Sequence, residues 1–466
     1  MEILQAAPIS KCHTRRMPTD RNLGIHRYTI FAKSYSYTNK EGLEKPIQCT
    51  TTVRLGPENY RELRIIKPLL TRWFYLLSLL VKFFSNSESA KDKTMRLSAA
   101  DMSTLQERNL KLSCLRCASY GKSNVGYYLL VIGGIALDIT ATVGKTAATS
   151  ILHTSTPGHV AQTLGGVGRN VAEAAWRTGA KNVKLISVVG DDLAGESVRK
   201  GMETIGMTTE HIHTLKNQPT AVYNALHSND GQLIAAVADM NIFDSLEPSK
   251  VTSIIQSEKP DFICFDGNIT SNLIESIATT CASLSIPALF EPTSVPKSLK
   301  LFQRAKTMQA RSIQYTTPNQ FELEAMCDQI RSDPSLKVGQ VDMSLLNQLK
   351  GVPRSVETVA PYAMFLSQYI PNIFTKLGEE GCLFVSKNAV IEYFSPEFIQ
   401  EHEIKSVTGA GDCFVGTLIA NLQKRGNKPL SGEVLKSIIQ KSQLSSIRTL
   451  KSDNAVSTQI LTDLLV

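Results

Sequence analysis

The chain has 466 residues, 42% hydrophobic and 20% charged, which is typical of a globular protein with a sizeable core. Its net charge of +8 belongs to the N-terminal quarter: residues 1–120 carry 20 Lys and Arg against 10 Asp and Glu, and the remainder carries 30 against 32. A near-neutral main region argues against nucleic-acid binding. The nine cysteines, an odd number placed mostly in apolar surroundings, favour reduced thiols and a cytoplasmic location.

Residues 1–120 are predicted to be a basic, largely disordered extension, because they show little sustained apolar periodicity. Residues 69–84 are the exception and are expected to form one apolar helix. The longest unbroken apolar run in this segment, Trp73–Leu77, is shorter than the roughly 20 residues that a membrane span needs. An accessory helix is therefore favoured over membrane association. The basic start leaves a mitochondrial presequence as the alternative to a cytoplasmic location.

From residue 126 to the end, apolar runs of strand length alternate with segments of helical periodicity. Strands are predicted at Tyr128–Ile132, Val183–Val189, Phe262–Phe265, Ala288–Phe290, Ile313–Thr316 and residues 373–374. Helices are predicted between them at Asn170–Thr178, Leu193–Ile205, Ile274–Ser283, Gln320–Ile330 and Val356–Tyr369. This alternation predicts an α/β fold with a doubly wound, mainly parallel sheet covered by helices on both faces.

Two segments, at about residues 140–165 and 207–239, break the alternation. The first is polar and strand-like, without a helical period. The second holds Thr220–His227 and Leu233–Ala238 on either side of Asn229-Asp-Gly231, a strong hairpin signal. Together they are predicted to form a small β-sheet that projects from the main sheet as a lid over a substrate.

Residues 405–420 combine a glycine-rich turn, a carboxylate and a helix. Gly409 and Gly411 allow successive backbone N–H groups to converge, and the apolar spacing from Phe414 onward places that point at a helix N-terminus, which favours anions. We interpret Asp412 as a general base that takes a proton from an alcohol while these N–H groups hold a transferred phosphoryl group. The alternative is an ordinary glycine-rich helix start with Asp412 in its first turn.

Polar residues also follow the ends of several predicted strands: Asp138, Asp192, Asp266, Asn268, Glu291, Asn319 and Glu322. Any one of them alone would suggest a cap or a turn. Their recurrence predicts the rim of a site, because ligands bind beyond the carboxyl ends of parallel strands. Asn319 and Glu322 fall in the first turn of a helix, where they could hold a hydrated Mg²⁺.

Several motifs occur together in a fixed order: Gly133-Gly-Ile-Ala-Leu-Asp138, Gly165-Gly-Val-Gly-Arg-Asn170, Gly190-Asp-Asp-Leu-Ala-Gly195, Asn319–Glu322, Lys376-Leu-Gly378 and Thr408-Gly-Ala-Gly-Asp412. Over about residues 126–466 the chain thus resembles the ribokinase-like (PfkB) sugar and nucleoside kinases. The resemblance implies a three-layer ribokinase-like fold, ATP and Mg²⁺ as cofactors, a small-molecule nucleoside or sugar as substrate, and a homodimer through the lid as one option.

The resemblance also implies roles for individual residues. Asp412 would be the catalytic base, and the turn at Gly409 with the amides of Ala410, Gly411 and Asp412 would form the anion hole. The implied substrate contacts are Asp138, Gly166, Asn170, Thr220, Tyr223, Asp266, Asn268 and Glu291; sheet packing is the alternative for Thr220 and Tyr223. The implied ATP contacts are Asn319, Lys376, Gly378, Thr408, Gly409 and Gly411, and the implied metal ligands are Asn319 and Glu322.

Within the family, the details resemble pseudouridine kinases: Gly165–Asn170, Val237–Met240, Asp266–Asn268, Glu291–Ser294 and Ala455–Ser457. Ser406 stands where most of these sugar kinases have an aspartate associated with a monovalent cation, which puts K⁺ activation in doubt. The expected activity is ATP-dependent phosphorylation of the 5′-hydroxyl of pseudouridine. The alternatives are a kinase of ribose, adenosine or fructose, and a catalytically silent nucleoside-binding domain.

Overall fold

The computed structural model describes residues 127–144, 155–230, 232–334, 336, 343–387, 390–426 and 430–466, together with five strands near the N-terminus. The chain divides into two units, Met1–Cys117 and Ala118–Val466. Among the described helices, none has both the length and the apolar character that crossing a membrane requires.

In the first unit, the strands lie in a region predicted to be largely disordered. Strands β1 (His13–Arg16), β2 (His26–Phe31) and β5 (Thr50–Leu55) form an antiparallel sheet, and β3 (Tyr35–Thr38) pairs with β4 (Glu44–Ile47). Their sequences contain the Thr, Tyr, Ile, Val and Phe that favour strands. The helix predicted at residues 69–84 lies outside the described residues.

The second unit is built on a nine-stranded sheet, which confirms the predicted mainly parallel architecture. In spatial order its strands are β10 (Ile212–Leu215), β9 (Asn182–Gly190), β6 (Tyr128–Ile132), β13 (Phe262–Asp266), β14 (Ala288–Glu291), β15 (Ile313–Thr316), β16 (Asn372–Lys376), β17 (Cys382–Ser386) and β18 (Val390–Phe394). Strands β10 to β16 run parallel to one another, and β17 and β18 add an antiparallel edge.

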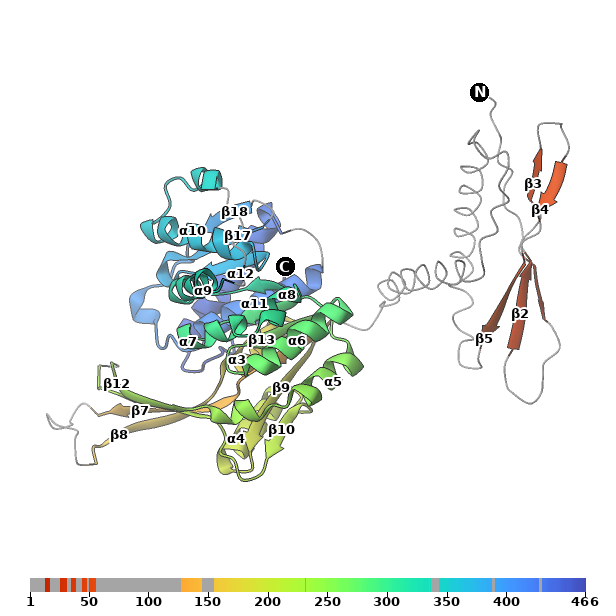
Figure 1. Ribbon diagram of the computed structural model, residues 1–466. Coiled ribbons are helices and arrows are strands. Elements are labelled where there is room, and N and C mark those ends of the chain that lie inside the picture. Colours follow the sequence, from red (N-terminus) through yellow and green to blue (C-terminus); the bar gives the residue numbers. More distant parts are fainter. Residues whose placement is uncertain are drawn as a thin grey trace. The chain divides into compact units, whose positions relative to one another are not determined.

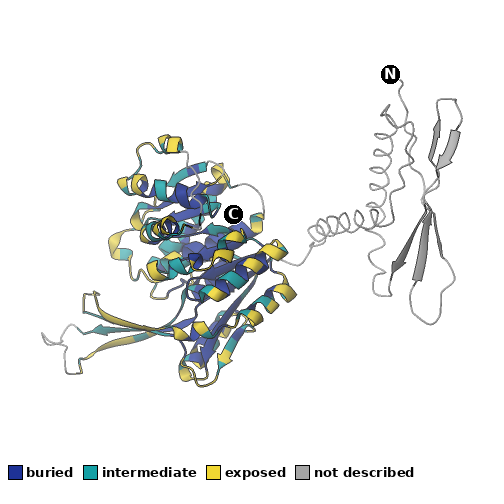
Figure 2. Ribbon diagram, viewed as in Figure 1, coloured by how far each residue is buried: buried dark blue, intermediate teal, exposed yellow. Residues whose placement is uncertain are grey.

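Helices cover both faces of this sheet (Figure 1). On one face α3 (Val167–Thr178), α11 (Ala410–Arg425) and α12 (Gly432–Leu450) pack against one another. The other face carries α5 (Pro248–Glu258), α6 (Ser271–Leu284), α8 (Ala305–Gln309), α9 (Gln320–Ser332) and α10 (Arg354–Ser367). The shorter α7 (Val295–Ser298) packs on α9, and α4 (Leu193–Ile205) contacts β9. The central strands are buried along their whole length, so the core follows the sheet (Figure 2).

A smaller sheet extends away from the large one, as predicted (Figure 1). It has the order β12 (Leu233–Asp239), β11 (Val222–His227), β7 (Ala136–Val143), β8 (Gly158–Gly165). The predicted hairpin joins β11 to β12, which are antiparallel, whereas β7 and β11 are parallel. We call this four-stranded sheet the lid. The predicted lid range 207–239 begins too early, because β10 pairs with β9 of the large sheet instead.

Candidate active site

Helix α11 begins at a left-handed turn that only glycine fits. Gly409 is its N-cap with φ of +77°, and a Cβ there would lie 1.9 Å from the carbonyl oxygen of Ala455. The helix starts at Ala410 and has Asp412 in its first turn, as predicted. The N–H of Ala410 is directed at the carbonyl of Val407, at 3.4 Å. The next two N–H groups of the turn, which have no intrahelical partner, are therefore the ones suited to bind an anion.

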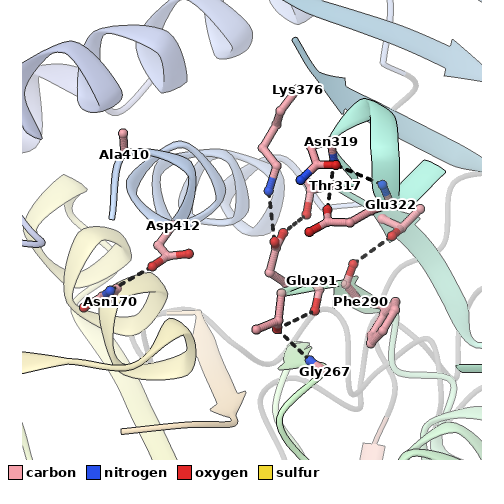
Figure 3. Close-up of polar contacts among 12 residues, drawn as sticks. Asn170, Gly267, Phe290, Glu291, Thr317, Asn319, Glu322, Lys376, Ala410 and Asp412 are labelled. Carbon is pink, nitrogen blue, oxygen red and sulfur yellow. Dashed lines mark hydrogen bonds and ion pairs between the residues drawn. The ribbon is translucent and has the colours of Figure 1, made fainter. Parts of the chain in front are cut away.

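Asp412 is half-buried beside this turn. The side-chain N–H of Asn170, from α3, donates to its Oδ2 at 2.7 Å (Figure 3). Burial raises the pKa of Asp412 to about 7, and Glu291 adds to the rise while Asn170 and Lys376 oppose it. The carboxyl group therefore changes its charge near neutral pH, which suits a general base.

A buried ion pair lies next to the same turn. Nζ of Lys376, at the end of β16, is 2.9 Å from Oε1 of Glu291, at the end of β14 (Figure 3). The same Nζ is 3.7 Å from the position that a Cβ on Gly411 would occupy, so the ammonium faces the first turn of α11. Thr317 donates to the other oxygen of Glu291. Burial lowers the pKa of Lys376, but Glu291 and Glu322 outweigh burial and raise it, so the side chain stays charged.

The predicted metal ligands form a capping box at the start of α9. Oδ1 of Asn319 accepts from the N–H of Glu322 at 2.9 Å, and Oε2 of Glu322 accepts from the N–H of Asn319 at 2.8 Å (Figure 3). Burial raises the pKa of Glu322, and Glu291 adds to this rise while Lys376 opposes it. The cap uses one oxygen of the carboxylate and leaves Oε1 for a cation. One carboxylate and one amide fit Mg²⁺, which usually keeps several of its waters.

Asp138 carries a largely buried carboxylate on lid strand β7. Its side chain is 9% exposed, and among the described residues the structure gives it no hydrogen bond. Its carboxylate lies over Gly165, where a Cβ would be 2.1 Å from Oδ2. Burial raises its pKa to about 6, against the lowering effect of Arg169. Neither carboxylate oxygen is among the fully enclosed side-chain atoms that lack a partner, so the carboxylate still reaches solvent and can accept a hydrogen bond from a ligand hydroxyl.

Asp138 was predicted to lie beyond the end of a strand, and this prediction is wrong. It lies inside β7, because the chain leaves β6 at Gly133-Gly134 and enters the lid at once. Tyr223 of β11 is its register partner on one side and Thr163 of β8 on the other. Directly opposite residues share a face of a sheet, so half-buried Tyr223 and Asp138 face the same way.

Thr220 has internal partners that fit the packing alternative. Its side chain is 1% exposed, and its hydroxyl and N–H donate to the two carboxylate oxygens of Asp192 at 2.5 and 2.8 Å. The hydroxyl also accepts from the N–H of Gly190. These bonds close the loop between β9 and α4, in which Asp192 is the N-cap.

Asp266 and Asn268 likewise hold the framework together. The carboxylate of Asp266 accepts from the N–H groups of Gly134 and Gly168 at 2.8 and 2.9 Å, and from the N–H and the amide of Asn268. Oδ1 of Asn268 accepts from Lys297 at 2.6 Å. The pair thus joins the loop after β6 to the start of α3. These bonds leave little capacity for a substrate, although both residues were predicted to contact it.

The remaining predicted residues lie on three loops: the loop after Lys376, the turn before α11 and the start of α3. Gly378, with φ of +62°, begins a short 3-10 helix directly after β16. Thr408 is exposed, and its N–H donates to Oγ of Ser406 at 3.2 Å. Gly166, with φ of +89°, is the N-cap of α3, where a Cβ would lie 2.6 Å from the Cα of Ile135. Each loop therefore borders the site.

Thr317, Lys297 and Arg169 are polar supports of this site that were not predicted from the sequence. Thr317 and Lys297 carry no signal of their own, because their partners lie 26 and 29 residues away. Arg169 and Glu173 are four residues apart on α3, a spacing that favours an ion pair, and the predicted helix began one residue after Arg169. That signal was available from the sequence.

A second group of potential metal ligands lies at the opposite edge of the sheet. Glu210, His211 and Glu258 have ligand atoms within 4.8 Å of one another. Nζ of Lys184 already bonds both carboxylates, at 2.9 and 3.0 Å. Its ammonium supplies the positive charge that a metal would bring, so this cluster is an ion-pair network.

A cavity of about 540 Å³ is also at the opposite edge of the sheet. It lies at the amino ends of β14 and β15, between residues that include Cys281, Pro287, Ser312, Tyr315 and Ser431. It shares no residue with the site around Asp412. The site is thus marked by converging charged groups and helix starts.

Comparison with known proteins decides the family. Residues 128–437 match the pfkB family of carbohydrate kinases. The chain belongs to the PfkB family. It is therefore a phosphotransferase with an alcohol acceptor, as the motifs predicted.

Curated relatives of this PfkB chain include pseudouridine kinases. It is 28% identical over 333 residues to the pseudouridine kinase of Arabidopsis thaliana, covering 63% of this chain and 84% of that one. It is 26% identical over 296 residues to the pseudouridine kinase of Escherichia coli, covering 62% and 82%. It is 29% identical over 329 residues to a pseudouridine-metabolizing bifunctional protein of Schizosaccharomyces pombe. That match covers 64% of this chain and 43% of the yeast protein, so the chain spans less than half of its length.

Solved structures similar to this PfkB chain include ribokinases. The ribokinase of Cryptococcus neoformans in complex with ADP has a TM-score of 0.54 at 19% identity, covering 71% of this chain and 97% of that one. The ribokinase of Arabidopsis thaliana, complexed with ribose and ATP, has a TM-score of 0.54 at 14% identity, covering 73% and 99%. These matches confirm the ribokinase-like fold.

The raised pKa of Asp412 predicts a pH-dependent effect of Asp412→Asn on stability. Because the folded pKa, about 7, exceeds the unfolded value, 3.8, the folded state binds more protons, and the wild type loses stability as pH rises between these values. The new amide at position 412 can present its oxygen to the NH₂ group of Asn170, which then keeps donating as in the wild type. We therefore expect the melting temperature of Asp412→Asn relative to wild type to increase from pH 5 to pH 7 and to level off above it, measured without ligands.

The matched control is Asp244→Asn, since Asp244 is exposed on the surface. Its difference from wild type should not vary with pH in this way. A constant difference for Asp412→Asn over the same range would contradict the environment described for this carboxyl group.

Proposed function

We propose that this chain is an ATP-dependent kinase that phosphorylates the 5′-hydroxyl of pseudouridine. The observation that carries the proposal is the carboxylate of Asp412, which titrates near neutral pH beside the amides of a helix N-terminus. A base in this position accepts the proton of an alcohol while the amides of Gly411 and Asp412 stabilise the transferred phosphoryl group. Catalysis of phosphoryl transfer rests mainly on such positioning and charge stabilisation.

The phosphate side of the site is supported by Lys376 and by the start of α9. In the proposal, the ammonium of Lys376, which faces the first turn of α11, stabilises the charge on the phosphates. The loops at Gly378, Thr408 and Gly409 hold ATP. Asn319 and Glu322 hold Mg²⁺, which when bound neutralises charge on the β- and γ-phosphates.

The substrate side is supported by the lid and the start of α3. Asp138 accepts ribose hydroxyls, since its carboxylate is largely buried and has no donor among the residues that the structure describes. Asn170 and the backbone at Gly166 border the same space. Tyr223 shares the face of the lid with Asp138 and contacts the base. Pseudouridine, rather than free ribose, is proposed because the Arabidopsis and Escherichia coli relatives are pseudouridine kinases.

A substrate panel tests this function. With ATP and Mg²⁺, release of ADP is measured for pseudouridine, uridine, adenosine, ribose and fructose, and we expect the highest kcat/KM with pseudouridine. Asp412→Asn should lower kcat by about 10²- to 10⁴-fold, because it removes the base, while ATP binding is retained. Preference for free ribose would contradict the proposed substrate. A folded protein with no turnover on any substrate would favour the nucleoside-binding alternative.

Glu322→Gln tests the proposed metal site. Glutamine keeps an oxygen that can cap α9 but removes the negative charge, so we expect the half-saturating Mg²⁺ concentration for turnover to rise roughly tenfold or more. The melting temperature should change little, which serves as the control for the helix. An unchanged Mg²⁺ requirement would remove Glu322 from the metal site.

We also propose that the lid pairs with a second copy of the chain. Every residue of its edge strand β12 is exposed, including Leu233 at 56%, Ile234 at 45% and Val237 at 70%. Exposed edge strands usually carry Lys, Pro or a bulge that prevents pairing. β12 has no Lys, Arg or Pro, and its one register shift lies at the hairpin end, where Leu233 and Ala235 pair with successive residues of β11, so Ala235–Asp239 remains regular. Its unpaired backbone and apolar side chains suit the same strand of another copy.

Val237→Lys tests the lid pairing. We expect the wild type to be a dimer at micromolar concentration and Val237→Lys to be a monomer, because a charge would be buried in the contact; the molar mass is measured by light scattering after size exclusion. Val434→Lys, an exposed valine on α12, should remain a dimer. A monomeric wild type would refute this pairing.

The cysteines support the proposed cytoplasmic location. The described cysteines are all free thiols and are all buried: Cys264, Cys281, Cys327, Cys382 and Cys413. Free thiols persist in reducing compartments. Mitochondrial import is the alternative.

A further inference from the structure

Arg169 is a buried cation next to the proposed base, and the catalytic roles above do not use it. Its side chain is 4% exposed on α3. One guanidinium nitrogen, Nη1, donates to the carbonyl of Leu164 at 2.7 Å and to Oδ1 of Asn170 at 2.6 Å. The other, Nη2, donates to Glu173. Arg169 therefore connects the end of lid strand β8 to the residue that bonds Asp412.

Stability alone gives a weak reason for an arginine at this position. The ion pair of Arg169 with Glu173 is almost fully buried, and Nε of Arg169 is a buried nitrogen for which the structure gives no hydrogen-bond partner among the described residues. Buried ion pairs often contribute no more stability than apolar side chains of similar size, because both charges lose their hydration. The position of the guanidinium suggests a further role.

The orientation of the Asn170 amide has a direct chemical consequence. The two ends of an asparagine amide have nearly the same shape, but one accepts hydrogen bonds and the other donates them. The end of Asn170 that faces Asp412 must donate if the carboxylate is to be held in its ionised form. If the amide were reversed, two oxygens would face each other.

Arg169 removes this ambiguity. Burial lowers the pKa of its guanidinium and Glu173 opposes that shift, and arginine side chains stay protonated in proteins. A protonated guanidinium can only donate, so the end of the Asn170 amide that faces it must be the oxygen. The NH₂ end then points to Asp412, where the structure has it, at 2.7 Å.

We propose that Arg169 is a positioning residue that fixes the orientation of the Asn170 amide, so that Asn170 always donates to Asp412. This inference rests on the proposed function, in which Asp412 is the base. Glu173 holds the guanidinium in place, and Arg177 holds Glu173 from the other side at 2.6 Å. The chain of contacts runs along consecutive turns of α3.

The consequence is a shift in the pH dependence of the base. The hydrogen bond from Asn170 lowers the pKa of Asp412, and losing it therefore raises that pKa. The other charged groups that face Asp412 are Glu291 on β14, Asp266 on β13 and Lys376 on β16, and a change at Arg169 leaves them in place. One hydrogen bond to a carboxylate corresponds to a shift of about one pH unit.

Arg169→Gln is the decisive variant, because a glutamine amide can donate or accept and no longer dictates the orientation of Asn170. The readout is the pH at which kcat/KM for pseudouridine falls to half on the acid side. We expect it near pH 7 in the wild type and about one unit higher in Arg169→Gln. Arg169→Lys, which can only donate, should stay close to the wild type. In an Asn170→Ala background, Arg169→Gln should cause no further shift.

Arg177→Gln is the matched control, since Arg177 also bonds Glu173 but not Asn170. The pH at which its kcat/KM falls to half on the acid side should match that of the wild type. A general effect of disturbing the buried ion pair would shift both arginine variants alike. The proposal would be overturned if active Arg169→Gln had the same half-activity pH as the wild type on the acid side. It would also be overturned if Arg177→Gln shifted that pH by as much as Arg169→Gln does.

A second measurement does not need kinase activity. The melting temperature of each parent is compared with that of its Asp412→Asn derivative across pH, and the pH at which this difference levels off reports the pKa of Asp412. It should lie higher in Arg169→Gln than in the wild type. If Arg169→Gln alone does not fold, the neutral pair Arg169→Gln with Glu173→Gln replaces it.

The two hypotheses can therefore fail separately. Absence of turnover in the folded wild type refutes the proposed function, whereas the melting comparison still measures the pKa of Asp412 in each background. An unchanged levelling pH in Arg169→Gln refutes the positioning role even if the wild type is an active kinase.

Discussion

The site depends on a carboxylate held at the amino end of a helix. Asp412 is partly withdrawn from water, and its hydrogen bond from Asn170 and the charge of Lys376 only partly offset the cost of ionising it. This position needs the left-handed turn at Gly409, which the carbonyl of Ala455 approaches too closely for any side chain. The C-terminal segment and α3 thus both determine where this carboxylate lies. Without these contacts the helix start would be an ordinary cap.

The balance of charge around Lys376 gives a physical reason for a metal. Three carboxylates, Glu291, Glu322 and Asp412, all act on this single ammonium and raise its pKa. Within the described residues the group is therefore net negative whenever Asp412 is ionised, and it would repel the phosphates of a nucleotide. A divalent cation offsets that repulsion, and the free oxygen of Glu322 is a suitable place to bind it.

The residues proposed to bind the phosphoryl acceptor and those proposed to bind the phosphoryl donor come from different parts of the fold. Asp138 and Tyr223 belong to the lid, whereas Lys376 and Asp412 belong to the large sheet and its covering helices. Helix α3 links the two parts, because its first residues contact the lid strand β8 and its Asn170 contacts α11. The proposed base and the proposed hydroxyl-binding carboxylate are therefore positioned by one helix start.

The sequence by itself determined what depends on local spacing. It gave the helix start at Ala410 with Asp412 in the first turn, because glycine φ preference and helical periodicity act over a few residues. Short sequence patterns likewise predicted the buried parallel strands and the hairpin of β11 and β12. The strands β17 and β18, along with α5 and α12, were missed. Strand β18 forms the edge of the sheet and is only half-buried, which weakens its pattern, whereas β17 is buried along its whole length.

Only the tertiary structure decided which polar groups face one another. Asn170 meets Asp412 across 242 residues and Lys376 meets Glu291 across 85, and no local pattern contains such pairings. The same holds for Asp266, which was predicted to contact a substrate and whose bonds with Gly134 and Gly168 no local pattern indicated, because two glycine loops converge on it in the fold. Residue types and their order determine which chemical roles are possible. The distances between side chains and their burial in the fold determine which of these roles each side chain has.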